Sequence, residues 1–174
     1  WLVWDGRRWA RNEKAAKRRA YTVGTAIRKE ATSLDDPELA KAYFSAANKA
    51  ESATGIAATL QIAAALRDID ADQTEFDTKP WLLNFANGTL DLKTGKLHTH
   101  ERADLITRLC PHECTSKAKC PRWHQFLDEI FDGDKELIRW IRWLVGYSCT
   151  GSTHRHLFPI MHGTGRNGKG AFIR

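Results

Sequence analysis

The sequence predicts an α+β fold that is mainly α-helical and carries small β-hairpins. Apolar residues recur at helical spacing in several stretches, and this periodicity predicts amphipathic helices. Two turn dipeptides, Asp5-Gly6 and Asn87-Gly88, stand between β-prone segments and predict hairpins. Near the C-terminal end, an apolar stretch runs into a glycine-rich segment with one lysine, which predicts a strand followed by a loop.

The first hairpin is predicted for residues 2–10 and the first helix for residues 13–31. Four apolar residues fall on one side of this helix, namely Ala16, Ala20, Val23 and Ile27. At roughly 100° per residue, four basic residues fall on the opposite side, namely Lys14, Lys17, Arg18 and Arg28. Gly24 lies between these turns and weakens the helix.

Two more helices are predicted before residue 70. Asp36 is an N-cap followed by proline at the first helical position, and the helix behind it extends to about Asn48. Residues 53–69 form a third helix that is apolar on most of its circumference, so we expect it in the centre of the core. The acidic residues 68–78 then predict a surface loop.

The second half begins with a small antiparallel meander in residues 81–100. A helix then starts near Pro121 and stops at Gly133, and another runs from Asp134 to about Gly146. Their tryptophans lie at amphipathic positions, so we expect them in the core rather than on a binding surface: these are Trp123, Trp140 and Trp143. Residues 156–161 predict a strand, although Pro159 lacks the N–H that a sheet ladder needs.

The composition is that of a soluble globular protein of 174 residues, with 42% hydrophobic and 28% charged residues. No apolar run approaches the roughly 20 residues that cross a bilayer, and no signal peptide opens the chain. Its four cysteines then favour reduced thiols and a cytoplasmic location. Because the chain opens on Trp1 and stops soon after the glycine-rich segment, we expect a piece of a longer protein.

The net charge of +6 is confined to the N-terminal segment. Residues 1–31 hold nine Lys/Arg and three Asp/Glu, whereas the remaining residues hold 18 of each. Such an excess is compatible with nucleic-acid binding, with Trp4 or Trp9 stacking on a base, although the charge alone is more typical of a solvated face. The candidate DNA contacts are Arg7, Arg8, Lys14, Lys17, Arg18 and Arg28. The alternative is an ordinary solvated outer face.

The glycine-rich segment from Gly163 to Gly170 matches the pattern G-x-x-x-x-G-K. Glycines let backbone N–H groups turn towards phosphates, and Lys169 reaches the β- and γ-phosphates as a charge. The residue after the lysine is Gly170, where a Ser or Thr hydroxyl ordinarily binds Mg²⁺. The alternative is a glycine-rich turn without a ligand.

Three cysteines and two histidines crowd a 15-residue stretch: Cys110, His112, Cys114, Cys120 and His124. Their spacing is not that of a standard zinc finger, so free thiols are favoured over a zinc site and no metal ligands are assigned. The histidines elsewhere and the acidic loop show no spacing that indicates acid–base or nucleophilic catalysis.

Five segments together carry a family resemblance: WDGRRW (4–9), NFANGTLDLKTGKLHTH (84–100), CPRWHQFLDEIF (120–131), IRWLVGYSCTGST (141–153) and GRNGKG (165–170). In this order and spacing they resemble the phage/plasmid primase–helicase family, whose poxvirus relatives share the helicase module. These proteins are superfamily III helicases of AAA+ type with a helical domain ahead of the ATPase core.

The resemblance implies a pre-helicase domain in residues 1–150 and the first strand and P-loop of an AAA+ ATPase in residues 151–174. It implies that the parent protein binds ATP and Mg²⁺, with the phosphates held by Gly163, Gly165, Asn167, Gly168, Lys169 and Gly170. It further implies a hexameric ring that unwinds DNA in a phage- or prophage-infected bacterium, next to a primase domain or other replication proteins.

The catalytic acids of such helicases would lie beyond Arg174, so the resemblance assigns no catalytic residue here and implies that this piece alone hydrolyses no ATP. The alternative is a non-catalytic adaptor domain of a replication initiator that binds DNA or a partner. Gly170 in place of Ser or Thr favours that alternative. A small-molecule kinase is disfavoured, because kinases usually carry this loop near their start.

Overall fold

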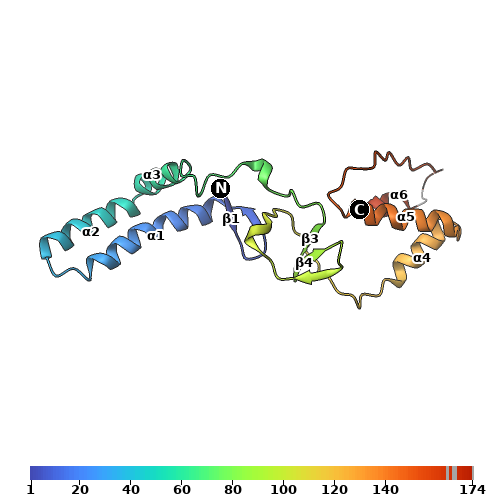
Figure 1. Cartoon of the computed structure of the whole chain (residues 1–174), viewed down its shortest axis with the longest axis horizontal. Coiled ribbons are helices and arrows are strands. Elements are labelled where there is room, and N and C mark those ends of the chain that lie inside the picture. Colours follow the sequence, from blue (N-terminus) through green and yellow to red (C-terminus); the bar gives the residue numbers. More distant parts are fainter. Residues whose placement is uncertain (164, 166–167, 174) are drawn as a thin grey trace. The chain divides into compact units, whose positions relative to one another are not determined.

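The computed structural model describes residues 1–163, 165 and 168–173. The chain forms two compact units, the first comprising Trp1–Asp77 and His100–Arg108 and the second Thr78–Thr99 and Leu109–Arg174. Figure 1 shows the elements in chain order, with helices and small antiparallel sheets, and confirms the α+β prediction. No described helix is both long and apolar enough to span a membrane.

The first unit opens with a two-stranded hairpin of β1 (Leu2–Trp4) and β2 (Trp9–Arg11), as predicted. The Asp5 carboxylate accepts hydrogen bonds from the backbone N–H groups of Arg7 and Arg8 at 2.8 and 2.9 Å, and these bonds fix the turn. Gly6 takes a φ of +102°, which L side chains rarely adopt. The hairpin is anchored to the returning segment because the Trp9 N–H donates to the Ile106 carbonyl at 2.9 Å.

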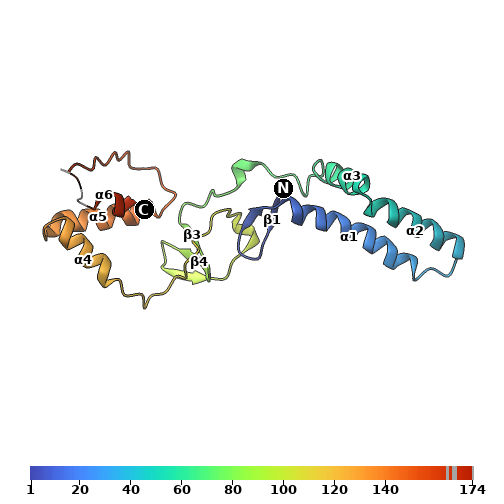
Figure 2. The ribbon, with the colours of Figure 1, turned by 180° about the vertical axis from the view of Figure 1, so that it is seen from behind.

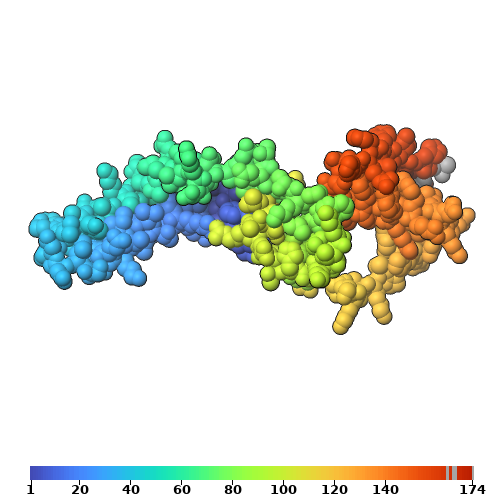
Figure 3. Space-filling view, in the orientation of Figure 1, coloured from blue at the N-terminus to red at the C-terminus, as the bar shows by residue number. Residues whose placement is uncertain are grey.

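Two helices form the body of this unit, α1 (Glu13–Ala31) and α2 (Pro37–Glu51). The Asn12 side chain caps α1 by accepting from the Ala15 N–H, and Asp36 caps α2 with Pro37 behind it. Both views of the ribbon place the two helices side by side (Figures 1 and 2), and Figure 3 shows their side chains in contact along the hairpin.

Small residues fill the buried positions of α1 and α2. The buried residues of the two helices are Ala16, Ala20, Gly24, Ala31 and Ala47. A Cβ on Gly24 would lie 3.1 Å from the Ala47 carbonyl oxygen and would collide with the Glu51 Cγ. The prediction that Val23 belongs to the buried stripe was therefore wrong. Val23 is exposed, because the helices approach closely enough only where a residue without a side chain faces the partner.

The third helix, α3 (Ala53–Ala63), differs from its prediction in both length and burial. It ends at Ala63, after which the chain continues in tight turns, and the short 3-10 helix η1 (Gln73–Glu75) lies in the predicted surface loop. None of its residues is buried, and Ile62 is 64% exposed. The helix α3 contacts α1 and α2. Its apolar residues extend around more of the helix than this contact covers, so some of them remain exposed.

The second unit contains the predicted meander. Its strands are β3 (Leu82–Phe85), β4 (Gly88–Asp91) and β5 (Lys96–His98), paired antiparallel in that order. A buried polar pair lies within the sheet, where the Thr89 hydroxyl donates to the Asn84 Oδ1 at 3.1 Å. The Asp91 carboxylate accepts from the Lys93 N–H and the Thr94 hydroxyl in the β4–β5 turn, and these bonds lower the pKa of Asp91.

Two helices follow the sheet, α4 (Pro121–Ile130) and α5 (Lys135–Ser148), at the predicted positions. Their core consists of Leu127, Ile138 and Ile141, and Leu127 is 0% exposed. Half-buried apolar residues surround it: Trp123, Phe126, Ile130, Phe131 and Phe172.

Two tryptophans of α5 depart from their prediction. Trp140 and Trp143 are 42% and 40% exposed, so their assignment to the core was wrong. They lie beside the buried row of α5 rather than on it, because this row is already occupied by Ile138, Ile141 and Leu144.

The strand predicted for residues 156–161 is not formed. Phe158 and Ile160 are 87% and 80% exposed. A strand is stabilised by hydrogen bonds to a neighbouring strand, and Pro159 contributes no N–H to such a ladder. In the described residues no partner strand lies along this segment, which explains why an apolar run with strand-like composition stays irregular.

Candidate functional site

The exposed side of α1 carries a group of basic residues without a carboxylate among them. We call this group the α1 basic face, and it consists of Lys14, Lys17, Arg18 and Lys29. All four are exposed, and at roughly 100° per residue they fall within one third of the helix circumference. The face spans about 22 Å along the helix axis, at 1.5 Å per residue.

Arg28, a predicted DNA contact, bonds to α2 in the structure. Its guanidinium donates to the carboxylate of Glu51 and to the Oδ1 of Asn48, both on α2, at 2.5 and 2.9 Å. The bond to the Glu51 carboxylate raises the pKa of Arg28. Arg28 therefore joins the two helices of the hairpin and does not belong to the α1 basic face.

The two arginines of the hairpin turn also differ from each other. Arg8 is half-buried, and its Nη1 donates to the Thr107 carbonyl at 3.3 Å while its Nε lies 3.7 Å from the Asp5 carboxylate. Arg7 lies exposed in the turn. Arg8 thus holds the hairpin against the returning segment, which leaves Arg7 as the more accessible arginine of the turn.

The rings of Trp4 and Trp9 contact each other and are only partly exposed to solvent. Their rings pack edge to face with centroids 6.0 Å apart, and Trp9 also meets the ring of Phe76 at 6.1 Å. The Arg102 guanidinium lies over the Trp9 ring at 5.4 Å. Both indoles are half-buried, so this aromatic group anchors the hairpin and is a poor platform for a base.

A different aromatic residue, Tyr21, lies on the α1 basic face. It is 46% exposed and follows Lys17 and Arg18 by one helical turn. The sequence contained the signal for Tyr21 and for Lys29, because both share the angular range of Lys14 and Arg18. From the sequence, Trp4, Trp9 and Arg28 were predicted as DNA contacts instead.

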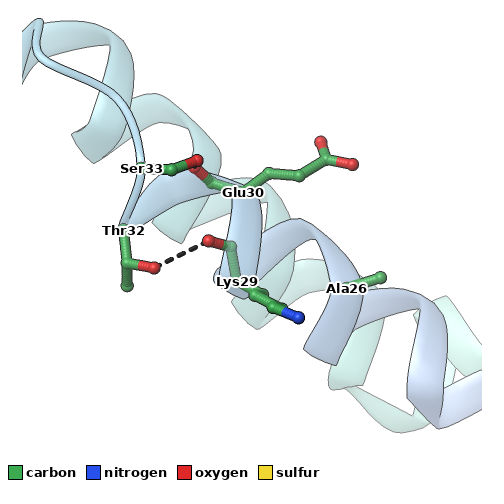
Figure 4. Close-up of a pocket in the computed structure, with 5 residues that line it drawn as sticks. All are labelled: Ala26, Lys29, Glu30, Thr32 and Ser33. Carbon is green, nitrogen blue, oxygen red and sulfur yellow. Dashed lines mark hydrogen bonds between the residues drawn. The ribbon is translucent and has the colours of Figure 1, made fainter.

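The C-terminal end of α1 forms a shallow hollow lined by Ala26, Lys29, Glu30, Thr32 and Ser33 (Figure 4). The Thr32 hydroxyl donates to the Lys29 carbonyl at 2.7 Å and closes the last turn of the helix. Figure 4 shows Lys29 and Glu30 leaving the helix in different directions. The Lys29 amino group consequently remains available on the basic side.

The glycine-rich segment leads into a short helix, α6 (Lys169–Ile173). Gly165 and Gly168 take φ values of +108° and +79°, a region that suits glycine. A Cβ on Gly168 would lie 2.8 Å from the Cγ2 of Ile130, so this glycine also permits close packing on α4. Phe172 continues that packing by stacking on Trp123 with ring centroids 6.0 Å apart.

The Lys169 ammonium donates to the Gly163 carbonyl at 3.3 Å and bridges the two ends of the segment. The next residue, Gly170, offers no hydroxyl. Asn167, a predicted phosphate contact, lies outside the described residues, as do Thr164 and Arg166.

The cysteines form no metal centre in the part of the chain that the structure describes, where no three potential ligands come together. Cys120 lies 3.5 Å from the Nε2 of His124, and the Nδ1 of His124 lies 2.7 Å from the guanidinium of Arg142. This contact joins the start of α4 to α5.

The family model described as "D5 N terminal like" matches residues 1–132 of the chain. The match begins at the first hairpin and ends just after α4, so it includes the α1 basic face and excludes the glycine-rich segment. No curated protein matches the chain.

Proposed function

The chain belongs to the D5 N terminal like family, a domain found in phage and plasmid primase–helicase proteins, and we propose that it holds DNA for the helicase of such a replication protein. The observation that carries the proposal is the α1 basic face. Gly24 lets α1 pack closely against Ala47 of α2. Lys14, Arg18 and Lys29 lie on the side of α1 that is turned away from this contact, and Lys17 lies at its edge.

The charge of this face suits a phosphate backbone. Lysine and arginine neutralise phosphates and release bound counterions, which supplies affinity without base recognition. Arg28 is already neutralised by Glu51, but among the described residues no carboxylate forms an ion pair with Lys14, Lys17 or Lys29. The Glu13 carboxylate attracts Lys17 from the preceding turn, and the face as a whole keeps an excess of positive charge.

In the parent protein, the glycine-rich segment would hold the phosphates of ATP, with Lys169 as the charged contact. ATP supplies the free energy for unwinding when it is bound with Mg²⁺ and hydrolysed. The packing of Gly168 and Phe172 on α4 supports this placement, because it connects the segment directly to the helical pair of the second unit. In this proposal residues 151–174 begin the ATPase domain, and a ring of six subunits places that segment at subunit interfaces.

The test is a binding titration of fluorescently labelled DNA by the 174-residue chain. We expect the triple variant Lys14→Gln, Arg18→Gln, Lys29→Gln to bind about tenfold or more weakly, because three phosphate contacts are lost. Glutamine keeps the helix propensity and removes only the charge. The matched control carries Lys41→Gln, Lys49→Gln and Arg67→Gln, three exposed cations of the same unit. Equal loss of binding in both variants would contradict a specific role for α1.

A second candidate function is supported by the outer surface of α5. Leu137, Trp140 and Trp143 are each about two-fifths exposed there, and exposed tryptophans of this kind are enriched at protein interfaces. An adaptor that binds another replication protein would use this surface. Trp140→Ala should then abolish capture of the partner protein while leaving the DNA affinity unchanged.

A further inference from the structure

Tyr21 is an exposed aromatic side chain in the middle of a charged helix. It is 46% exposed, and its angular position lies between those of Lys17 and Lys14 on the α1 basic face. A helical side chain leans towards the N-terminus, over the preceding turn. The phenol ring therefore lies beside Lys17 and Arg18, which occupy that turn.

The faces of the Tyr21 ring are available for stacking. Among the described residues, no aromatic ring stacks on Tyr21 and no cation lies over it. The tryptophans of the same unit are different, since Trp9 contacts Trp4, Phe76 and Arg102. The Arg28 guanidinium interacts electrostatically with Tyr21, but no ring stacks on Tyr21, which is the exposed aromatic residue of the α1 basic face.

An aromatic side chain set among lysines and arginines is the arrangement with which proteins bind single-stranded nucleic acid. The cations track the phosphates, and unpaired bases stack on the ring whatever their identity. In a duplex the base faces are covered by neighbouring bases, so the same ring gains no stacking there. The turn that carries Lys17 and Arg18 immediately precedes Tyr21. A phosphate bound at that turn would place the base of the same nucleotide near the Tyr21 ring.

From this arrangement we infer that Tyr21 stacks on a base of single-stranded DNA bound along the α1 basic face. The stacking contact gives the face its preference for single-stranded over duplex DNA. This inference rests on the proposed function and specifies its substrate.

The experiment measures dissociation constants of the 174-residue chain for three labelled probes: oligothymidylate, an abasic oligomer with the same number of phosphates, and a duplex. We expect Tyr21→Ala to weaken oligothymidylate binding about fivefold or more. Its affinity for the abasic oligomer and for the duplex should equal that of the wild type. Tyr21→Phe keeps the ring and should bind oligothymidylate as the wild type does.

Three results would overturn the inference, and they are distinguishable. Wild-type affinity for oligothymidylate in Tyr21→Ala, with binding still lost in the Lys14, Arg18 and Lys29 triple variant, would refute the stacking role alone and leave the proposed function standing. Absence of DNA binding by the wild-type chain would refute both. An equal loss on the abasic oligomer would show that Tyr21→Ala disturbs the helix and not a stacked base, and would also refute the inference. Circular dichroism checks that α1 is intact in each variant.

Discussion

The two helical pairs of this chain are held together in opposite ways. In α1 and α2 the buried residues are alanines and one glycine, with Ala47 at 0% exposure. In α4 and α5 it consists of large apolar side chains around Leu127, supplemented by stacked aromatic rings. Small residues let two backbones approach closely, but each buries little apolar area, whereas a fully buried large side chain such as Leu127 removes more apolar area from water.

This difference explains why the two pairs expose different kinds of surface. A helix that packs through a narrow stripe of small residues leaves most of its circumference to solvent, and on α1 that surface is basic. In the pair α4–α5 large apolar side chains form a core, and Trp140 and Trp143 remain exposed on an apolar surface. The first pair is therefore suited to a charged polymer and the second to a protein surface.

The largest expected effect comes from the apolar core. Leu127→Ala should lower the free energy of unfolding by about 2–5 kcal/mol, because it removes a fully buried side chain and leaves a cavity. Hydrogen exchange should show the loss in α4 and α5 and not in α1 and α2. Leu137→Ala, at a site that is 39% exposed, is the control and should have a much smaller effect. Equal effects would contradict the core assignment.

A smaller effect on stability is expected from a substitution between α1 and α2. Gly24→Val should destabilise α1 and α2 by about 1–3 kcal/mol, since the added side chain meets the Ala47 carbonyl and Glu51. Thr25→Val, one position further along the helix and exposed, keeps the β-branched shape and should be nearly neutral. Urea unfolding measures the change in stability, and hydrogen exchange in peptides from α1 and α2 locates it. A stable Gly24→Val variant would show that the helices can separate without cost.

The smallest effect is expected from the ion pair between α1 and α2. The side chain of Arg28 is 39% exposed and that of Glu51 is 14% exposed, so solvent screens much of their attraction. Glu51→Gln should lower the stability less than the two core substitutions do. The difference from the wild type should shrink in high salt, where the charge contribution is screened. Thermal melts at two salt concentrations check this, and a difference that is independent of salt would assign the effect to packing.

Local sequence signals predicted the elements well. The caps at Asp36 and Asp134, the Asp5-Gly6 turn and the stop at Gly133 lie where the structure has them. These features depend on side chains that bond to their own neighbouring backbone, so a short stretch of sequence contains their cause.

Burial was predicted less well, because it depends on which elements meet. The sequence showed that α3 is apolar, but it did not show that only one side of this helix is covered. It also predicted Val23 as a buried residue of α1, whereas Gly24 occupies the buried position. The strand predicted for residues 156–161 failed for the same reason, since its apolar pattern could not supply a neighbouring strand.

The candidate DNA site was predicted in part. Charge density along the chain identified the N-terminal segment, and Lys14, Lys17 and Arg18 are exposed as expected. The sequence could not show that Arg8 and Arg28 are engaged by Thr107 and Glu51, because both partners are distant in the chain. The role of each of these residues in binding stays a prediction.

The salt dependence of single-stranded DNA binding tests the central claim most directly. For the wild-type chain, log K should fall linearly with log salt concentration. The triple variant of Lys14, Arg18 and Lys29 should have a slope smaller by about 2, at about 0.7 per lost phosphate contact on a single strand, while the Lys41, Lys49 and Arg67 control keeps the wild-type slope. Identical slopes for the triple variant and the wild type would contradict the claim that α1 holds the DNA backbone.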